Sequence, residues 1–254
     1  LNPSSAASDV YKRQVMADYQ SARAASTAAN ISLDAGLRAH MTKVYGLMAV
    51  AMLITGLVAY AVGTSQTMLA AIFNTPLKGV VMFAPLGVVF LFGAKINSMK
   101  YETAQLVFWV FAGLVGLSIS YIFAVYTGVS IASTFFTTAI AFASLSLYGY
   151  TTKRDLSGMG SFLFMGLIGL LVASVINIFV ASSAMHFAIS IIGVLIFAGL
   201  TAYDTQNIKS TYLQLRTAYG EEAAAKAGIM GALSLYLNFL NMFMFLLSFM
   251  GNRE

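Results

Sequence analysis

Residues 156–204 read LSGMGSFLFMGLIGLLVASVINIFVASSAMHFAISIIGVLIFAGLTAYD and carry no Asp, Glu, Lys or Arg before the final Asp204. A membrane span needs about 20 mostly apolar residues in a helix, because the hydrocarbon layer is ~30 Å thick. The stretch is long enough for two such spans, and Ala-Ser-Ser-Ala at 181–184 provides a break between them. It therefore predicts two membrane helices with a carboxylate near the end of the second.

The composition of the whole chain also indicates a membrane protein. Hydrophobic residues make up 59% of its 254 residues and charged residues only 9%, whereas soluble domains carry about 25% charged residues. Too few polar residues are left to cover a globule, so lipid must be the outer solvent. The chain has no cysteine, which excludes disulfides, thiolate metal sites and cysteine nucleophiles.

The other uncharged stretches divide into spans by the same length. Together they predict an all-α membrane protein with seven transmembrane helices, at about 44–63, 79–96, 103–125, 130–150, 160–181, 185–206 and 229–250. We interpret residues 1–15 as a non-native scar, because their composition differs and Met16 follows as a natural start would. Residues 16–42 are then a polar cytoplasmic N-terminal tail, and residues 43–252 are the seven-helix domain.

Basic residues predict the orientation, because cytoplasmic loops near span ends carry the excess of Lys and Arg. With a cytoplasmic N-terminus, only Lys78 and Arg253 face the outside. Ten face the cytoplasm, namely Arg23, Arg38, Lys43, Lys95, Lys100, Lys153, Arg154, Lys209, Arg216 and Lys226. We therefore expect the C-terminus outside. Anionic lipid headgroups explain the formal charge of +5 without any nucleic-acid partner.

Two spans have unusual internal residues. Pro85 and Gly87 predict a bend in the second span, since proline removes a backbone donor and clashes with the preceding turn. The fourth span carries the hydroxyl residues Ser130, Ser133, Thr134, Thr137, Thr138, Ser144 and Ser146. We expect this helix to face other helices, where hydroxyls allow close packing, with pore lining as the alternative.

A polar stripe is predicted in the last span. Ser234, Asn238 and Asn241 are four and three residues apart, which places them on one helix face. Asn177 in the fifth span could meet this stripe. Either hydrogen bonding between helices or a polar pathway would account for it.

Asp204 is the carboxylate that adjoins an uninterrupted apolar helix, five residues before Lys209 and about 7 Å of helix rise from it. Ionisable groups at membrane depth are costly and indicate a functional site. The alternative is that the span ends earlier, so that Asp204 lies among the lipid headgroups.

Several protein classes are excluded by missing residues. A retinal protein would need a lysine in the last helix for its Schiff base, and residues 227–252 contain none. An intramembrane aspartyl protease would need two carboxylates in the membrane, and only Asp204 qualifies. No Gly-x-Ser-x-Gly motif, phosphate-binding loop or metal-ligand cluster occurs. We expect neither an enzyme nor a cofactor.

Three long stretches, taken in this order, resemble those of a known protein family. They are SIASTFFTTAIAFASLSLYGYTTKRDLSGMGSFLFMGLIGLLVASVIN at 130–177, GLTAYDTQNIK at 199–209 and IMGALSLYLNFLNMF at 229–243. They resemble the Bax inhibitor-1 family, and most closely its bacterial inner-membrane branch. The resemblance covers about residues 30–252. It implies six helices around a central seventh in the bacterial inner (plasma) membrane, and a pH-sensitive calcium leak.

The resemblance also implies a gate. In the family, one aspartate on the sixth helix and one on the seventh share a proton and hold a closed state. Asp204 matches the first position, but the second is Asn238. An acidic residue that some members carry in the second helix is absent from the matching stretch APLG at 84–87. Two close carboxylates cannot both ionise, and an Asp–Asn pair lacks that coupling, so we expect a blunted or shifted pH response.

Calcium prefers six to eight oxygen ligands, so one carboxylate with amides and hydroxyls predicts a weak, transient calcium site at Asp204 and a leak instead of tight binding. A second hypothesis is a non-conducting regulator, since the resemblance implies that some bacterial relatives associate with a membrane-bound AAA protease. The polar tail at about 16–40 would contact such a partner. A proton-coupled transporter is the weaker third hypothesis, because Asp204 has no acidic or histidine relay partner.

The depths of the two gate residues differ along the sequence. Asn238 lies about twelve residues beyond Lys226, deeper than Asp204 lies from Lys209. For the two to meet, either the sixth helix continues past Asp204 or the cytoplasmic end of the seventh is buried.

Overall fold

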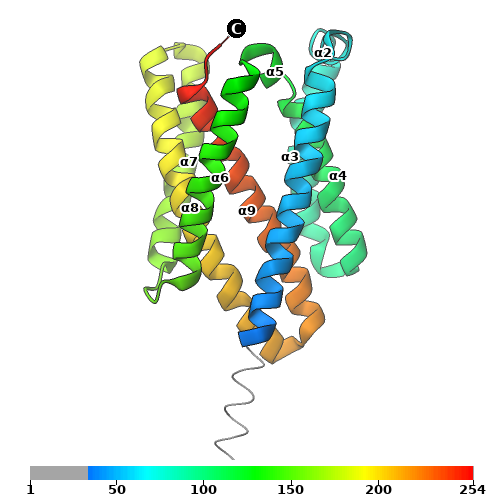
Figure 1. Ribbon diagram of the computed structural model, residues 1–254, viewed down its shortest axis with the longest axis vertical. Coiled ribbons are helices and arrows are strands. Elements are labelled where there is room, and N and C mark those ends of the chain that lie inside the picture. Colours follow the sequence, from blue (N-terminus) through cyan, green and yellow to red (C-terminus); the bar gives the residue numbers. More distant parts are fainter. Residues whose placement is uncertain (1–33, 254) are drawn as a thin grey trace, which may run out of the picture.

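Seven long apolar helices form the protein in a computed structural model that describes residues 34–253 (Figure 1). In chain order the helices are the N-terminal span Asp34–Gly63, α2 Gln66–Phe73, α3 Leu77–Lys95, the short 3-10 helix η1 Ile96–Ser98, α4 Tyr101–Ile119, α5 Ile122–Val125, α6 Gly128–Thr151, α7 Ser157–Val180, α8 Ser183–Tyr219 and α9 Glu221–Met250. The predicted non-native scar over 1–15 and residues 16–33 of the predicted tail lie outside the described residues. The all-α fold with seven candidate membrane spans is confirmed.

The early spans differ from their predicted bounds in two places. The N-terminal span is already helical at Asp34, so residues 34–42 of the predicted tail belong to this helix. The third predicted span, 103–125, is interrupted at Ser120, whose hydroxyl donates to the carbonyl of Leu117 (2.8 Å). The gaps between charged residues show only where the chain is apolar. They do not give the helix bounds, because a helix can continue into polar residues or break within an apolar stretch.

The largest difference is in α8 and α9. The sixth span was predicted to end at 206, but α8 continues to Tyr219, and α9 begins at Glu221 instead of 229. The 37 residues of α8 measure about 55 Å, more than the ~40–45 Å of a bilayer with its headgroups. Tyr212 and Ala224 in these extensions are fully buried, because the two helices pack on each other and Tyr212 also packs on His40 of the N-terminal span. The helix therefore runs past Asp204, and the depth mismatch noted in the sequence disappears.

The helical bundle has two opposite ends. The α8–α9 turn lies at the same end as the start of the N-terminal span, and the C-terminus lies at the other end with α2 and α5 (Figure 1). There the amide of Asn252 donates to the Ser130 hydroxyl (3.0 Å), and the amide of Thr127 donates to the carbonyl of Asn252 (3.1 Å). We call the first the turn end and the second the C-terminal end.

The last helix forms the core. In the apolar window of α9, 61% of residues are buried, against 39% or less in each other span. It packs against α8, α6 and α4, and in Figure 1 it runs between them. The arrangement of six helices around a central seventh stays a prediction.

The fourth predicted span, α6, shows why it carries so many hydroxyls. Ser130, Thr134, Thr138 and Ser146 are buried on one face, while Ser133, Thr137 and Ser144 are exposed and donate to carbonyls of their own helix. Gly149 continues the buried face and lies directly against the backbone of Ala202 in α8. The buried face of α6 thus supports close helix packing over pore lining.

Candidate functional site

Asp204 and Asn238 lie in direct contact between α8 and α9. The Asn238 amide Nδ2 donates to the Asp204 carboxylate Oδ2 at 2.7 Å. Asn238 is buried and Asp204 is half-buried. A hydrogen bond to a charged acceptor is about twice as strong as one between neutral groups, so the amide stabilises the carboxylate where little water is available.

The tight helical hairpin brings this pair together. A single residue, Gly220, separates α8 from α9, and its φ of 84° is a conformation that favours glycine. Further along α9, Gly231 lies against the Ile208 side chain, and a Cβ there would overlap with it. The two helices can therefore approach closely from the turn as far as Asp204 and Asn238.

A cavity of about 590 Å³ extends from Asp204 toward the turn end. Asp204 and Ser234 lie at its deep part, and Tyr219 and Glu222 line it close to the turn. The other polar side chains in its wall are His40, Asn207, Thr211 and Lys226. Fifteen residues of α8 separate Asp204 from Tyr219, about 22 Å of helix rise. The cavity thus connects the buried pair with the helix ends beyond it.

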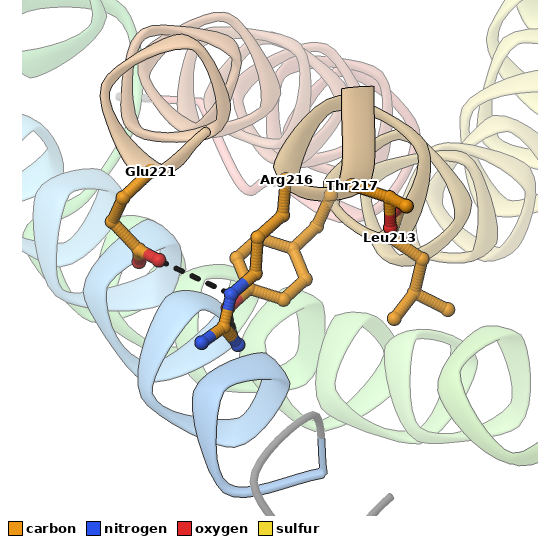
Figure 2. Close-up of polar contacts among 5 residues, drawn as sticks. Leu213, Arg216, Thr217 and Glu221 are labelled. Atoms are coloured by element: carbon orange, nitrogen blue, oxygen red, sulfur yellow. Dashed lines mark hydrogen bonds and ion pairs between the residues drawn. The ribbon is translucent and has the colours of Figure 1, made fainter. Parts of the chain in front are cut away.

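Ion pairs and a ring stack surround the turn end of this cavity. Arg216 Nε lies 3.3 Å from the Glu221 carboxylate, and its Nη1 donates to the Tyr212 hydroxyl at 2.7 Å (Figure 2). Lys226 and Glu222 pair at 3.2 Å one helical turn apart. The His40 ring stacks on Tyr212 with centroids 4.4 Å apart. Exposed ion pairs of this kind contribute about 0–1 kcal/mol each to stability. They therefore stabilise the turn end only weakly.

The other predicted polar residues are placed differently. Ser234 lines the cavity, but Asn241 donates to the Leu237 carbonyl of its own helix (2.8 Å). Asn177 accepts from the amide of Ser182 (3.1 Å) at the α7–α8 turn, about 33 Å of helix rise from Asp204. No hydrogen bond among the described residues joins Asn177 to α9. The prediction that Asn177 meets the stripe is therefore wrong: a polar residue at a helix end is satisfied by the exposed backbone there.

The predicted bend in the second span also lies away from the pair. Helix α3 continues without a break through Pro85. Pro85 is half-buried and Gly87 is exposed, with open space where a Cβ would lie. Helix α3 packs mainly on α4, and neither residue lines the cavity at Asp204, so they do not contribute to the Asp204 site.

The pair offers few ligands to a metal ion. Among the described residues, no group of three or more His, Cys, Asp or Glu side chains could hold a metal. The other oxygens in the cavity that Asp204 lines come from amides and hydroxyls such as Asn207, Thr211 and Ser234. Such a set suits brief contact with a hard cation better than a fixed site.

Two buried hydroxyl groups, which the sequence did not reveal, cross-link the helices near the pair. The hydroxyls of Tyr236 in α9 and Thr55 in the N-terminal span lie 2.7 Å apart, and Thr55 also donates to the Ala112 carbonyl in α4 (2.8 Å). Tyr236 precedes Asn238 by two residues. The one sequence signal for this contact was a tyrosine within an apolar span, because a buried phenol hydroxyl needs a hydrogen-bond partner.

A second network lies on the other side of α8. The Ser146 hydroxyl in α6 contacts the hydroxyls of Tyr45 (2.5 Å) and Thr205 (2.9 Å). Gln206, the next residue, donates to the Arg154 carbonyl (2.7 Å) and accepts from the Leu156 amide (2.9 Å). The residues directly after Asp204 are therefore fixed to α6 and to the α6–α7 loop.

Comparison with known proteins gives a consistent result. A family model described as "Inhibitor of apoptosis-promoting Bax1" matches residues 37–254. An uncharacterized protein of Rickettsia prowazekii is 47% identical over 229 residues, which cover 90% of this chain and 96% of the relative. Inner membrane protein YbhL of Escherichia coli strain K12 is 44% identical, over 87% of this chain and 94% of the relative. An uncharacterized membrane protein of Streptococcus pyogenes is 34% identical, over 87% and 96%.

Proposed function

The chain belongs to the Bax inhibitor-1 family, and on that premise we propose that it lets cations, calcium among them, leak slowly across the membrane. The contact between Asp204 and Asn238 at 2.7 Å, at the deep end of a polar cavity, is the observation that carries this proposal. The pair closes the path, and the carboxylate attracts a cation that reaches it from the cavity.

Calcium passes without being held. One carboxylate and a few neutral oxygens cannot replace the six to eight ligands of a tight site. The amide of Asn238 occupies one carboxylate oxygen in the closed arrangement. Because a single carboxylate lacks the coupled titration of two, the leak responds to pH only weakly.

We place the protein in the bacterial inner membrane with the turn end in the cytoplasm. Among the described residues, nine of the eleven basic side chains belong to helix ends and loops at the turn end, and Lys78 and Arg253 belong to the C-terminal end. Cytoplasmic sides carry such an excess, and the relative of Escherichia coli is named an inner membrane protein. The cavity then opens toward the cytoplasm.

Cysteine labelling tests this orientation, because the chain contains no cysteine of its own. We expect the single variants Thr217→Cys and Ser234→Cys to react with a membrane-impermeant maleimide in inside-out vesicles. The exposed Asn252→Cys should react only in spheroplasts, from the outside. Reaction of Ser234→Cys from the outside, or the reverse pattern for the other two variants, would contradict the proposed orientation.

Removing the carboxylate tests the leak itself. We expect Asp204→Asn to lower calcium entry into proteoliposomes about tenfold or more, because a charge about 4 Å from a cation is worth several kcal/mol even at an effective dielectric constant near 20. Entry is followed with a calcium dye inside the vesicles at about pH 7.

Asp155→Asn is the matched control for this measurement. The Ser157 hydroxyl and then its backbone amide donate to Asp155 and hold the pKa of that carboxyl below its usual range. Asp155 is therefore ionised throughout the neutral range, exposed and outside the spans, and its loss should leave entry unchanged. Equal entry in the wild type and Asp204→Asn would reject the gate. No entry in any folded variant would favour the non-conducting regulator.

A further inference from the structure

A groove runs along the outside of the protein between the N-terminal span and α6. It consists of two hollows of about 670 Å³ and 470 Å³. Met48 and Ala49 line both hollows, so the two form one continuous groove. Leu53, Leu57 and Leu147 in its walls are each more than 60% exposed, which shows that it is open to the surroundings. We call it the lateral groove.

The end of the lateral groove nearest the turn end carries positive charge from two elements. Arg38 of the N-terminal span and Tyr150 of α6 line it there. Lys209 of α8 reaches Tyr150, since its Nζ donates to the Tyr150 carbonyl at 3.1 Å and lies 5.2 Å from the ring centroid. An anion at this end would meet the Arg38 guanidinium and the Tyr150 ring, and the Lys209 ammonium lies against that ring.

Away from this end the lateral groove becomes apolar. Beyond the Tyr45–Ser146 hydroxyl pair, Met52, Phe135 and Phe239 form the wall. The part of the N-terminal span that lines the groove runs from Arg38 to Leu57. This is a helix rise of about 28 Å, which exceeds half of a bilayer of ~40–45 Å with its headgroups.

We propose that the lateral groove binds one anionic phospholipid of the leaflet at the turn end. Its phosphate lies between Arg38 and Lys209, and one acyl chain follows Met48 and Ala49 toward Leu53. Charge complementarity selects an anionic headgroup, because each juxtamembrane cation contributes about 1 kcal/mol to binding anionic lipid. Lipid surrounds this surface in the membrane, and the groove is long enough to hold an acyl chain of one leaflet.

Native mass spectrometry of the detergent-purified full chain tests the proposal. We expect the wild type to retain phosphatidylglycerol about thirtyfold more than phosphatidylethanolamine with the same acyl chains, which corresponds to about 2 kcal/mol from the two cations. Arg38→Gln leaves Lys209 in place and should lower that preference about fivefold. Ala49→Phe, which fills the junction of the two hollows, should lower retention of phosphatidylglycerol by at least the same factor.

Two matched variants control for charge and bulk. Lys78→Gln removes a cation at the C-terminal end, and Ala132→Phe adds a ring at an exposed α6 position outside the groove lining. Neither should change retention, and all four variants should keep the wild-type helical circular dichroism. Equal retention of both lipids, or retention unaffected by Arg38→Gln and Ala49→Phe in folded protein, would overturn the proposal. A dimer abolished by Ala49→Phe would instead identify a second copy as the occupant and overturn it too.

Discussion

Asn238→Asp should make calcium entry depend steeply on pH. The substitution places a second carboxylate where the Asn238 amide now donates to Asp204 at 2.7 Å. Two carboxylates at this distance cannot both ionise without strong repulsion, so they share one proton and titrate as a pair. Loss of the shared proton leaves two negative charges in contact, which pushes α8 and α9 apart and opens the path.

The expected readout is the slope of calcium entry against pH between about pH 6 and pH 8 in proteoliposomes. Entry through Asn238→Asp should rise with pH and change about tenfold over this range, since 1.4 kcal/mol of repulsion is enough for that factor. The wild type should change by less than about threefold. Asn241→Asp is the matched control, because Asn241 bonds within its own helix. Equally steep profiles for the two variants would exclude a specific pair.

Gly149→Leu should destabilise the protein more than any other single change considered above. A Cβ at Gly149 would overlap with the carbonyl and Cα of Ala202 in α8, and a backbone atom cannot move aside as a side chain can. The larger side chain must separate α6 from α8, which costs about 3 kcal/mol. The shift also disturbs the hydroxyl contact between Ser146 and Thr205 at 2.9 Å.

The measurement is thermal unfolding in detergent, with the fall in midpoint compared between two glycine variants. Gly169→Leu is the control, because no atom lies within 4 Å of a Cβ at that exposed position. Gly149→Leu should lower the midpoint by several degrees while Gly169→Leu leaves it nearly unchanged. Equal midpoints for both variants would mean that α6 and α8 do not pack as closely as described.

The spans could be predicted from the sequence because lipid imposes one strict rule. A helix in hydrocarbon must be apolar over about 20 residues, so the uncharged stretch 156–203 alone required two helices. The ends of the helices could not be predicted by the same rule. Helix α8 continues to Tyr219, and His40 of the N-terminal span stacks on its buried Tyr212. Such packing between helices leaves no mark on the spacing of charges.

The contact between Asp204 and Asn238 was predicted only through the family resemblance. Spacing placed Asn238 on a polar face of α9, but it did not tell which residue that face would meet. The same face was expected to reach Asn177, which instead accepts a hydrogen bond from the backbone of the α7–α8 turn. The Thr55–Tyr236 contact, between residues 181 positions apart, could not be predicted because serine, threonine and tyrosine hydroxyls have many possible partners in a helical bundle.

The claim that the pair, as a unit, gates the leak is tested most directly by exchanging its two residues. The double variant Asp204→Asn/Asn238→Asp keeps one carboxylate and one amide but moves the carboxylate from α8 to α9. Calcium entry into proteoliposomes is measured beside the wild type and Asp204→Asn. We predict entry within about twofold of the wild type for the exchanged pair, against the tenfold loss expected for Asp204→Asn alone. Entry as low in the exchanged variant as in Asp204→Asn would contradict the account and show that the carboxylate acts from α8 alone.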